Sequence, residues 1–242
     1  MATCTWMTLH LLRFPEPLQV DDVDLTGGPD HAIVWLYGDE SPLDENDLRT
    51  HVTPLWAALG LWRGRGDADA ILNTPEAFLP DLPRTVEAWH ALLQPIAHRG
   101  ETNWLDRSSP GPAIEPEPID PGGPLVVITS AGVNMEQGFD LERAKDFSRG
   151  VERVKHAAKT MPGNIVRHSF SNPTREHDGF TVTLWRDDEA MTNFAYQPGV
   201  HKTLLAEHWA VPKFDRSSFT RARVLRAVGI WEGGDPLRMV TA

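Results

Sequence analysis

Hydrophobic and polar residues follow clear periodic patterns in the second half of the chain. Residues 125–130 (LVVITS) form a short apolar run with the length of a buried strand. Apolar residues then recur at spacings of three and four, with charged residues between them, at Leu141, Ala144, Phe147, Val151, Val154 and Ala158. This spacing predicts an amphipathic helix. Asp140 stands at the N-cap position, and Pro162-Gly163 predicts the end of the helix.

Two strands and a second helix are predicted next. Residues 165–170 and 180–185 have strand character, and turn-forming residues at 171–173 and 177–179 separate them. Asp187-Asp188-Glu189 places acids where the dipole of a helix N-terminus favours them, and Pro198-Gly199 is expected to kink or split that helix. Residues 219–228 predict the last strand. The order β-α-β-β-α-β is typical of a ferredoxin-like unit.

The first half of the chain shows a weaker version of this pattern. We predict strands at 7–14 and 32–37, helices at 47–59 and 83–93, and a closing strand at 93–97. Two fragments, 33–40 and 95–104, resemble 182–188 and 224–231 in the second half. The similarity favours a diverged duplication. The insertion-like stretch 63–75 matches no element of the second half.

A stretch rich in Pro and Gly separates the two halves and predicts a linker. We therefore expect a diverged ferredoxin-like lobe at 1–108, the linker at 109–123, and a complete ferredoxin-like lobe at 124–242. The fold class is α+β. Two such sheets can pack face to face around a cavity, with the second sheet supplied by the duplication or by a homodimer.

Composition narrows the class of ligand. The 242 residues include nine Trp and nine Phe, which favours an apolar pocket for a flat or lipid-like molecule. The net charge of −11 would repel nucleic acid. Cys4 is the single cysteine, so an intrachain disulfide or a cysteine-based metal cluster is excluded. We find no signal peptide and no run of about 18 apolar residues that would span a membrane, and therefore expect a cytoplasmic protein.

Histidine and arginine are the candidate functional residues, because the chain contains no GxGxxG, P-loop, GxSxG or HExxH motif. His201 follows the Pro198-Gly199 break, where a turn could direct the imidazole into the cavity as an iron ligand. His208 lies two turns further on and competes with it. His168 is expected on one face of its strand and Arg167 on the other. Arg221 and Arg223 are candidates to pair with carboxylates of a cofactor or ligand.

Several motifs of the second half resemble the spheroidene monooxygenase family. They are TLWRDDEAM at 183–191, FAY at 194–196, His201, and RARVL at 221–225. The resemblance implies a dimeric α+β barrel relative that binds heme b and activates oxygen or peroxide, with His201 as the proximal ligand. It also implies that Trp185 and Tyr196 pack near the macrocycle and that His168 or Arg167 acts on the distal side.

The family resemblance leaves the substrate and the chemistry open. A heme protein of similar size in this broad group acts in antibiotic biosynthesis on a guanidino nitrogen of arginine, so N-hydroxylation of L-arginine is one hypothesis. An electron donor protein or peroxide would be the partner. The alternatives are a cofactor-free enzyme of the same barrel group, using His168 or Arg167, and a non-catalytic heme-binding protein.

Overall fold

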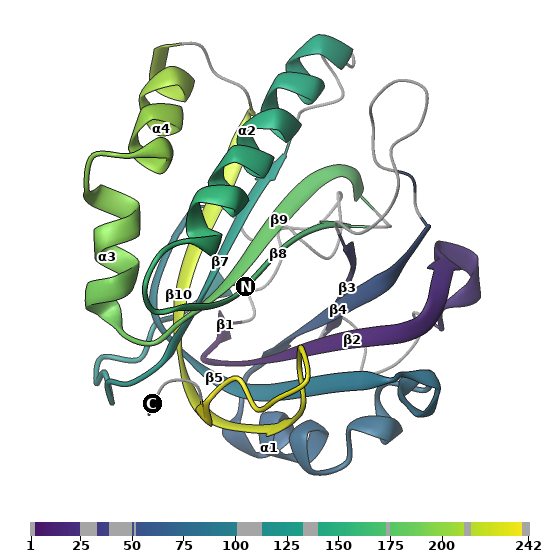
Figure 1. The fold of residues 1–242 in the computed structure, drawn as a ribbon. Coiled ribbons are helices and arrows are strands. Elements are labelled where there is room, and N and C mark those ends of the chain that lie inside the picture. The colour runs from purple at the N-terminus through teal and green to yellow at the C-terminus, as the bar shows by residue number, and fades with distance from the viewer. Residues whose placement is uncertain are drawn as a thin grey trace.

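The protein is an eight-stranded antiparallel barrel with helices on its outer surface, as seen in a computed structural model (Figure 1). The structure describes residues 3–24, 33–38, 50, 52–100, 113–132, 140–172, 175–210 and 214–238. The barrel strands are β2 (Trp6–Gln19), β3 (Ile33–Gly38), β4 (Val52–Trp62), β5 (Glu87–Gly100), β7 (Leu125–Gly132), β8 (Asn164–Asn172), β9 (Arg175–Trp185) and β10 (Arg216–Gly229). A separate parallel pair joins β1 (Thr3–Cys4) to β6 (Ala113–Ile114).

Each half of the chain contributes four consecutive barrel strands in the same spatial order. The order is β5-β2-β4-β3 in the first half and β10-β7-β9-β8 in the second. The fourth strands meet at one seam, β5 with β10, and the second strands meet at the other, β3 with β8. This confirms the expected α+β class, with a ferredoxin-like second lobe and a diverged similar first lobe. The barrel closes within one chain, so its closure needs no second copy.

The helices of the second half lie where the sequence predicts them. They are α2 (Leu141–Lys159), α3 (Asp188–Tyr196) and α4 (Val200–Ala210). Asp140 caps α2 by accepting from the backbone N–H of Arg143, and Asp187 caps α3 by accepting from that of Ala190. Pro198-Gly199 separates α3 from α4, as expected. Figure 1 shows these three helices on the outer side of the second half-sheet, with α1 (Arg65–Asn73) on the opposite side of the barrel.

The two helices predicted in the first half were wrong. Residues 52–59 belong to β4 and residues 87–93 to β5; residues 47–49 and 51 lie outside the described residues. Nearly every residue of β4 is buried, because one face packs inside the barrel and the other beneath the outer layer. A strand buried on both faces loses its alternating pattern and cannot be told from a buried helix by periodicity. The unmatched stretch 63–75 contains α1. The described residues also include three short 3-10 turns, at Val20–Asp22, Pro75–Ala77 and Leu82–Arg84.

The barrel interior is filled by side chains. Its largest apolar cluster draws on both half-sheets and includes Leu9, Leu59, Trp89, Ile128 and Trp231. The sequence expectation of a ligand chamber between the two stacked sheets is therefore wrong. Buried apolar side chains of seven barrel strands, β2, β4, β5, β7, β8, β9 and β10, pack together there and leave the outer layers of the barrel as the place for a site.

Candidate functional site

The two faces of the second half-sheet differ sharply in chemistry. Cross-strand register places Arg167, Thr183, Val127 and Arg221 in one row, and Ser169, Thr181, Thr129 and Phe219 in the next. Paired residues of neighbouring strands point to the same side, and these rows share the side of Trp185 and Leu125, which pack against α3. We call this side the helix-side face.

The helix-side face has an apolar, buried part against α3 and a polar, partly covered part on β8 and β9. In β8 the inward residues are buried, whereas Arg167 and Ser169 on the helix side are half-exposed. Thr181 and Thr183 of β9 and Thr129 of β7 are half-exposed as well. A sheet face covered by helices is normally apolar and buried. Hydroxyl and guanidinium groups under helices indicate a face that binds something other than the helices.

Helix α2 meets this face with an apolar side that is not fully buried. Ala158 is the one buried residue of α2, and Phe147, Val151 and Val154 are half-exposed. The predicted amphipathic helix is present, but its apolar stripe lacks a complete partner surface. The layer between α2 and the sheet is therefore incompletely packed, whereas α3 packs closely on Leu125 and Trp185.

His201 stands at the start of α4 with a defined hydrogen bond. Its Nδ1 lies 3.1 Å from the carbonyl oxygen of Ala195 in α3. A carbonyl can only accept, so Nδ1 carries the proton and the Nε2 of the neutral ring keeps its lone pair. Iron-binding histidines generally donate their other ring N–H in this way.

Two contacts between tilted aromatic rings connect His201 to the sheet. The Phe194 ring centroid lies 5.5 Å from that of His201 and 5.2 Å from that of Trp185. Trp185 is 1% exposed, and its Nε1 donates to the hydroxyl of Thr183 at 2.8 Å. Trp185 thus packs α3 against the sheet, and Phe194 lies in contact with both Trp185 and the His201 imidazole.

These residues fit a heme group. A bound porphyrin needs an axial nitrogen, apolar contacts and partners for its carboxylates. This layer offers the Nε2 of His201 as the nitrogen, the half-exposed apolar side of α2 for contact, and cationic strand residues as the partners. Arg221 is half-exposed on this face, and its Nε has no hydrogen-bond partner among the described residues. Arg167 donates only to Asn164 Oδ1, at 3.3 Å, among the same residues.

Other sequence candidates lie elsewhere. Tyr196 ends α3 with 65% of its surface exposed, so it does not line the layer. His208 stacks on Phe214, with ring centroids 3.8 Å apart. His168 faces the barrel interior, as expected from its strand position, and its Nε2 accepts from Trp231 Nε1 at 3.1 Å. The sheet therefore separates His168 from His201, whereas Arg167 shares the face of His201's helices.

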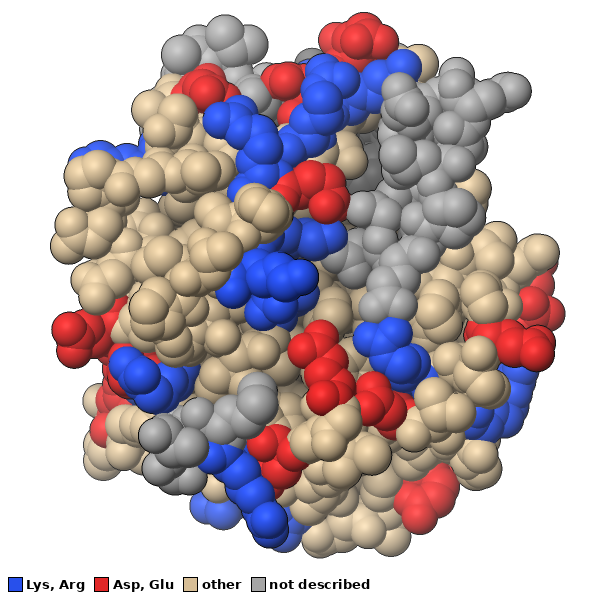
Figure 2. Space-filling view, in the orientation of Figure 1, with Lys and Arg blue, Asp and Glu red and all other residues tan. Residues whose placement is uncertain are grey.

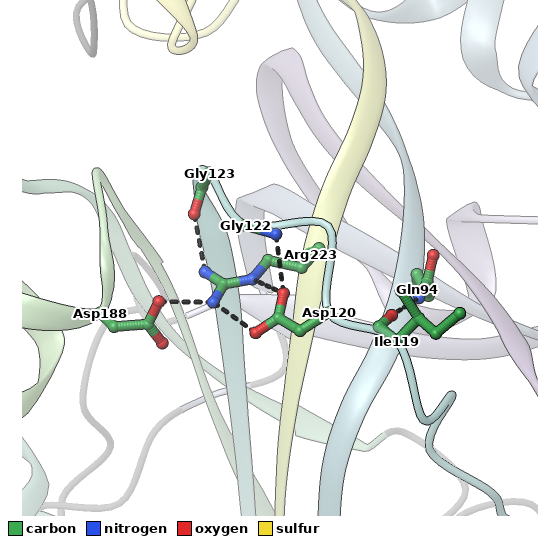
Figure 3. A network of polar contacts seen from close by, with 7 residues as sticks. All are labelled: Gln94, Ile119, Asp120, Gly122, Gly123, Asp188 and Arg223. Atoms are coloured by element: carbon green, nitrogen blue, oxygen red, sulfur yellow. Dashed lines mark hydrogen bonds and ion pairs between the residues drawn. The ribbon is translucent and has the colours of Figure 1, made fainter.

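Arg223 is committed to the protein itself (Figure 3). Its guanidinium forms a two-point contact with Asp120, at 2.6 and 2.7 Å, donates to the Gly123 carbonyl at 2.7 Å and contacts Asp188. The hydrogen bond from Arg223 lowers the pKa of Asp120 below its usual range. The expectation that Arg223 pairs with a ligand carboxylate was wrong, because two protein carboxylates already neutralise it. Asp120 was missed by sequence reasoning; its only signal is the turn-forming Asp120-Pro121-Gly122-Gly123 run.

The described residues contain no group of three or more His, Cys, Asp or Glu that could hold a metal ion. Within the same part of the chain, no helix is long and apolar enough to cross a membrane. A single imidazole can hold heme, since the porphyrin supplies the other four nitrogens.

Comparisons with known proteins place the fold without fixing the activity. Residues 130–217 match a family described as a domain of unknown function, DUF3291. No curated protein matches the chain. Among solved structures, an aldoxime dehydratase in complex with butyraldoxime is 8% identical, over 98% of this chain and 85% of that chain, with a TM-score of 0.55.

Two further solved structures resemble the chain. Another aldoxime dehydratase is 10% identical, over 90% of this chain and 81% of that chain, with a TM-score of 0.52. A candidate monooxygenase from Fusobacterium nucleatum subsp. nucleatum is 12% identical, over 97% and 98% of the two chains, with a TM-score of 0.42. The two dehydratases share the fold of this chain.

Proposed function

We propose that the protein is a heme-dependent monooxygenase that hydroxylates a small-molecule metabolite in a biosynthetic pathway. The observation that carries this proposal is the hydrogen bond between His201 Nδ1 and the Ala195 carbonyl, which orients the imidazole and leaves Nε2 as the nitrogen that can bind iron. The incompletely packed layer beside it supports the same conclusion. The structural likeness to aldoxime dehydratases adds that this fold serves small-molecule enzymes, although a fold does not fix a function.

Each residue of the layer has a role that follows from its chemistry. His201 would hold heme b, which when bound supplies the activation of oxygen or peroxide. Arg167 and the hydroxyl groups of Thr181 and Thr183 would bind and orient a polar substrate by hydrogen bonds. The apolar side of α2, with Phe147 and Val151, would exclude water from the substrate.

The reducing partner would be an electron donor protein or peroxide. Helix α2 carries six Lys or Arg and three Asp or Glu, in a chain of net charge −11. Figure 2 shows Lys and Arg side chains gathered over this helix. Carboxylates pair with five of these cations, at Arg143, Lys145, Arg149, Arg153 and Lys155. The surface above the proposed site is therefore close to neutral and would repel an acidic donor less than the rest of this acidic chain does.

The substrate is proposed more narrowly from the family resemblance. N-hydroxylation of L-arginine, as in the heme protein of D-cycloserine biosynthesis, requires a site that accepts a cationic amino acid. Arg167 suits its carboxylate. Formation of N-hydroxyarginine from L-arginine by the heme-loaded protein, with an electron donor or peroxide, tests this narrower proposal.

Hemin binding tests the main proposal. The purified protein titrated with hemin should develop a Soret band with one-to-one stoichiometry. His201→Ala should abolish or shift that band, and His208→Ala, on the same helix, should leave it unchanged. A protein that takes up no hemin refutes the proposal. Heme that binds but never reacts with oxygen or peroxide in the presence of a donor identifies a heme-binding protein instead.

A cofactor-free enzyme is the second candidate, and the polar helix-side face favours it. Hydroxyl groups and Arg167 can bind and polarise a reactive small molecule without iron. This candidate predicts turnover in metal-free protein that is abolished by Arg167→Gln and unaffected by His201→Ala.

A further inference from the structure

The Arg223 network joins three segments that are distant in sequence (Figure 3). Asp120 and Gly123 precede β7, Arg223 belongs to β10, and Asp188 is the first residue of α3. The Arg223 side chain is 3% exposed, whereas the two carboxylates are nearly half-exposed. The guanidinium is thus a fixed point in the sheet, and Asp188 holds the beginning of α3 against it.

Helix α3 connects this fixed point to the candidate iron ligand. Its first residue, Asp188, contacts Arg223, and its last turn presents the Phe194 ring and the Ala195 carbonyl to His201. The helix has nine residues and its own N-cap at Asp187. Hydrogen bonds along a helix fix its rise at about 1.5 Å per residue, so α3 moves as one body. A displacement of Asp188 therefore also displaces the Ala195 carbonyl oxygen.

We infer that Arg223 and Asp188 are positioning residues: they fix α3 so that the Ala195 carbonyl selects the His201 tautomer with Nε2 open. The iron-binding consequence rests on the proposed function, whereas the choice of tautomer concerns this chain alone. Neutral histidine in water samples both tautomers, and the partner of one nitrogen decides which persists. The planar fork of arginine suits this role, because it grips Asp120 at two points and keeps a donor for Asp188.

The test compares two first-turn acids of helices. Asp188→Ala removes the contact to Arg223, and Glu142→Ala removes a more exposed first-turn acid of α2 whose ion pair with Lys145 is 3.5 Å long. Both changes cost similar helix-dipole energy. Asp188→Ala also loses the contact to the buried Arg223 guanidinium, which Asp120 still pairs at two points, so it should melt below Glu142→Ala while remaining folded. Any difference between them at His201 then reports on the Arg223 contact.

The readout is the tautomer of His201 in the metal-free protein. Long-range 1H–15N NMR at pH 8.5, assigned with His201→Gln, should show a single Nδ1–H tautomer in the parent protein and in Glu142→Ala. Asp188→Ala should show a mixture, and Asp188→Glu should restore much of the single form. A single Nδ1–H tautomer in Asp188→Ala, or a mixture in the parent protein, overturns the inference.

Hemin affinity separates this inference from the proposed function. If both hold, Asp188→Ala binds hemin roughly three- to tenfold more weakly than Glu142→Ala, because the support of the ligand is loosened. If the parent protein binds no hemin while the tautomer result holds, the proposed function fails and the positioning role stands. If hemin binds and Asp188→Ala keeps the single tautomer, the positioning role fails and the proposed function stands.

Discussion

The Nδ1 atoms of His10 and His90 lie 2.8 Å apart, on paired residues of β2 and β5. Both rings are buried, and the Nε2 of His10 has no hydrogen-bond partner among the described residues. One Nδ1 must donate and the other accept, so the two rings cannot both be charged. Burial is the main cause that lowers the pKa of His90 to about 4 and the pKa of His10 well below its ordinary value.

Stability should therefore fall with acid before the carboxylates titrate. The folded-state pKa values lie below the ordinary value of 6.5, so the unfolded chain binds more protons between pH 6.5 and 4. We expect the free energy of unfolding to be level above about pH 6.5 and to drop by on the order of 2 kcal/mol at pH 5 from His90 alone. Urea unfolding at pH 7.5 and 5.0 measures this. The double variant His10→Leu/His90→Leu should lose most of the drop; an equal drop in that variant contradicts the assignment.

Gly163, in the turn between α2 and β8, has a conformation that only glycine adopts easily. Its φ is +81°, and a Cβ there would lie 2.6 Å from the Cβ of Ala190 in α3. Gly163→Ala should cost about 1–3 kcal/mol, from the backbone conformation and from the clash with α3. Gly66→Ala is the matched control, since Gly66 lies in α1 with open space around it and should gain about 0.5–1 kcal/mol. Thermal unfolding of both variants decides: a neutral Gly163→Ala would mean that α3 can move away.

Two buried tryptophans allow the contribution of one hydrogen bond to the free energy of unfolding to be measured. Trp231 Nε1 donates to His168, whereas Trp89 Nε1 is buried without a partner among the described residues. Both side chains are at most 2% exposed, so Trp→Phe removes similar volume at each. Trp231→Phe should cost about 1–3 kcal/mol more than Trp89→Phe, because it removes a buried hydrogen bond to His168, while the other change removes a donor that has no partner among the described residues. Chemical denaturation measures the difference; equal costs would show that the Trp231 bond contributes nothing net.

Two neighbouring aromatic residues of α3 should differ in their effect on hemin binding. Phe194 contacts both Trp185 and His201, and Tyr196 is 65% exposed. Phe194→Ala should weaken hemin binding roughly tenfold, since the ligand loses its packing support. Tyr196→Phe should leave the affinity unchanged. A titration monitored at the Soret band tests both, and a marked loss in Tyr196→Phe would return that residue to the site.

The second half of the chain was largely predictable because its elements carry local signals. Asp140, Pro162-Gly163 and Asp187 mark helix ends through their own backbone chemistry, and the structure keeps all three boundaries within a residue or two. The first half was less predictable. Strand β4 is buried on both faces, so its apolar run gave no period that distinguishes strand from helix.

The sequence by itself determined the ferredoxin-like order of elements, the side of β8 on which His168 and Arg167 lie, and the break that begins α4 at Val200. Only the tertiary structure decided where a site can form. Closing two half-sheets into one barrel fills the space between them with side chains and leaves the incompletely packed layer outside, under α2. It also decided that Asp120 and Asp188 neutralise Arg223. Arg167, in contrast, donates only to Asn164 among the described residues. These outcomes depend on contacts between residues far apart in the chain, which no local pattern encodes.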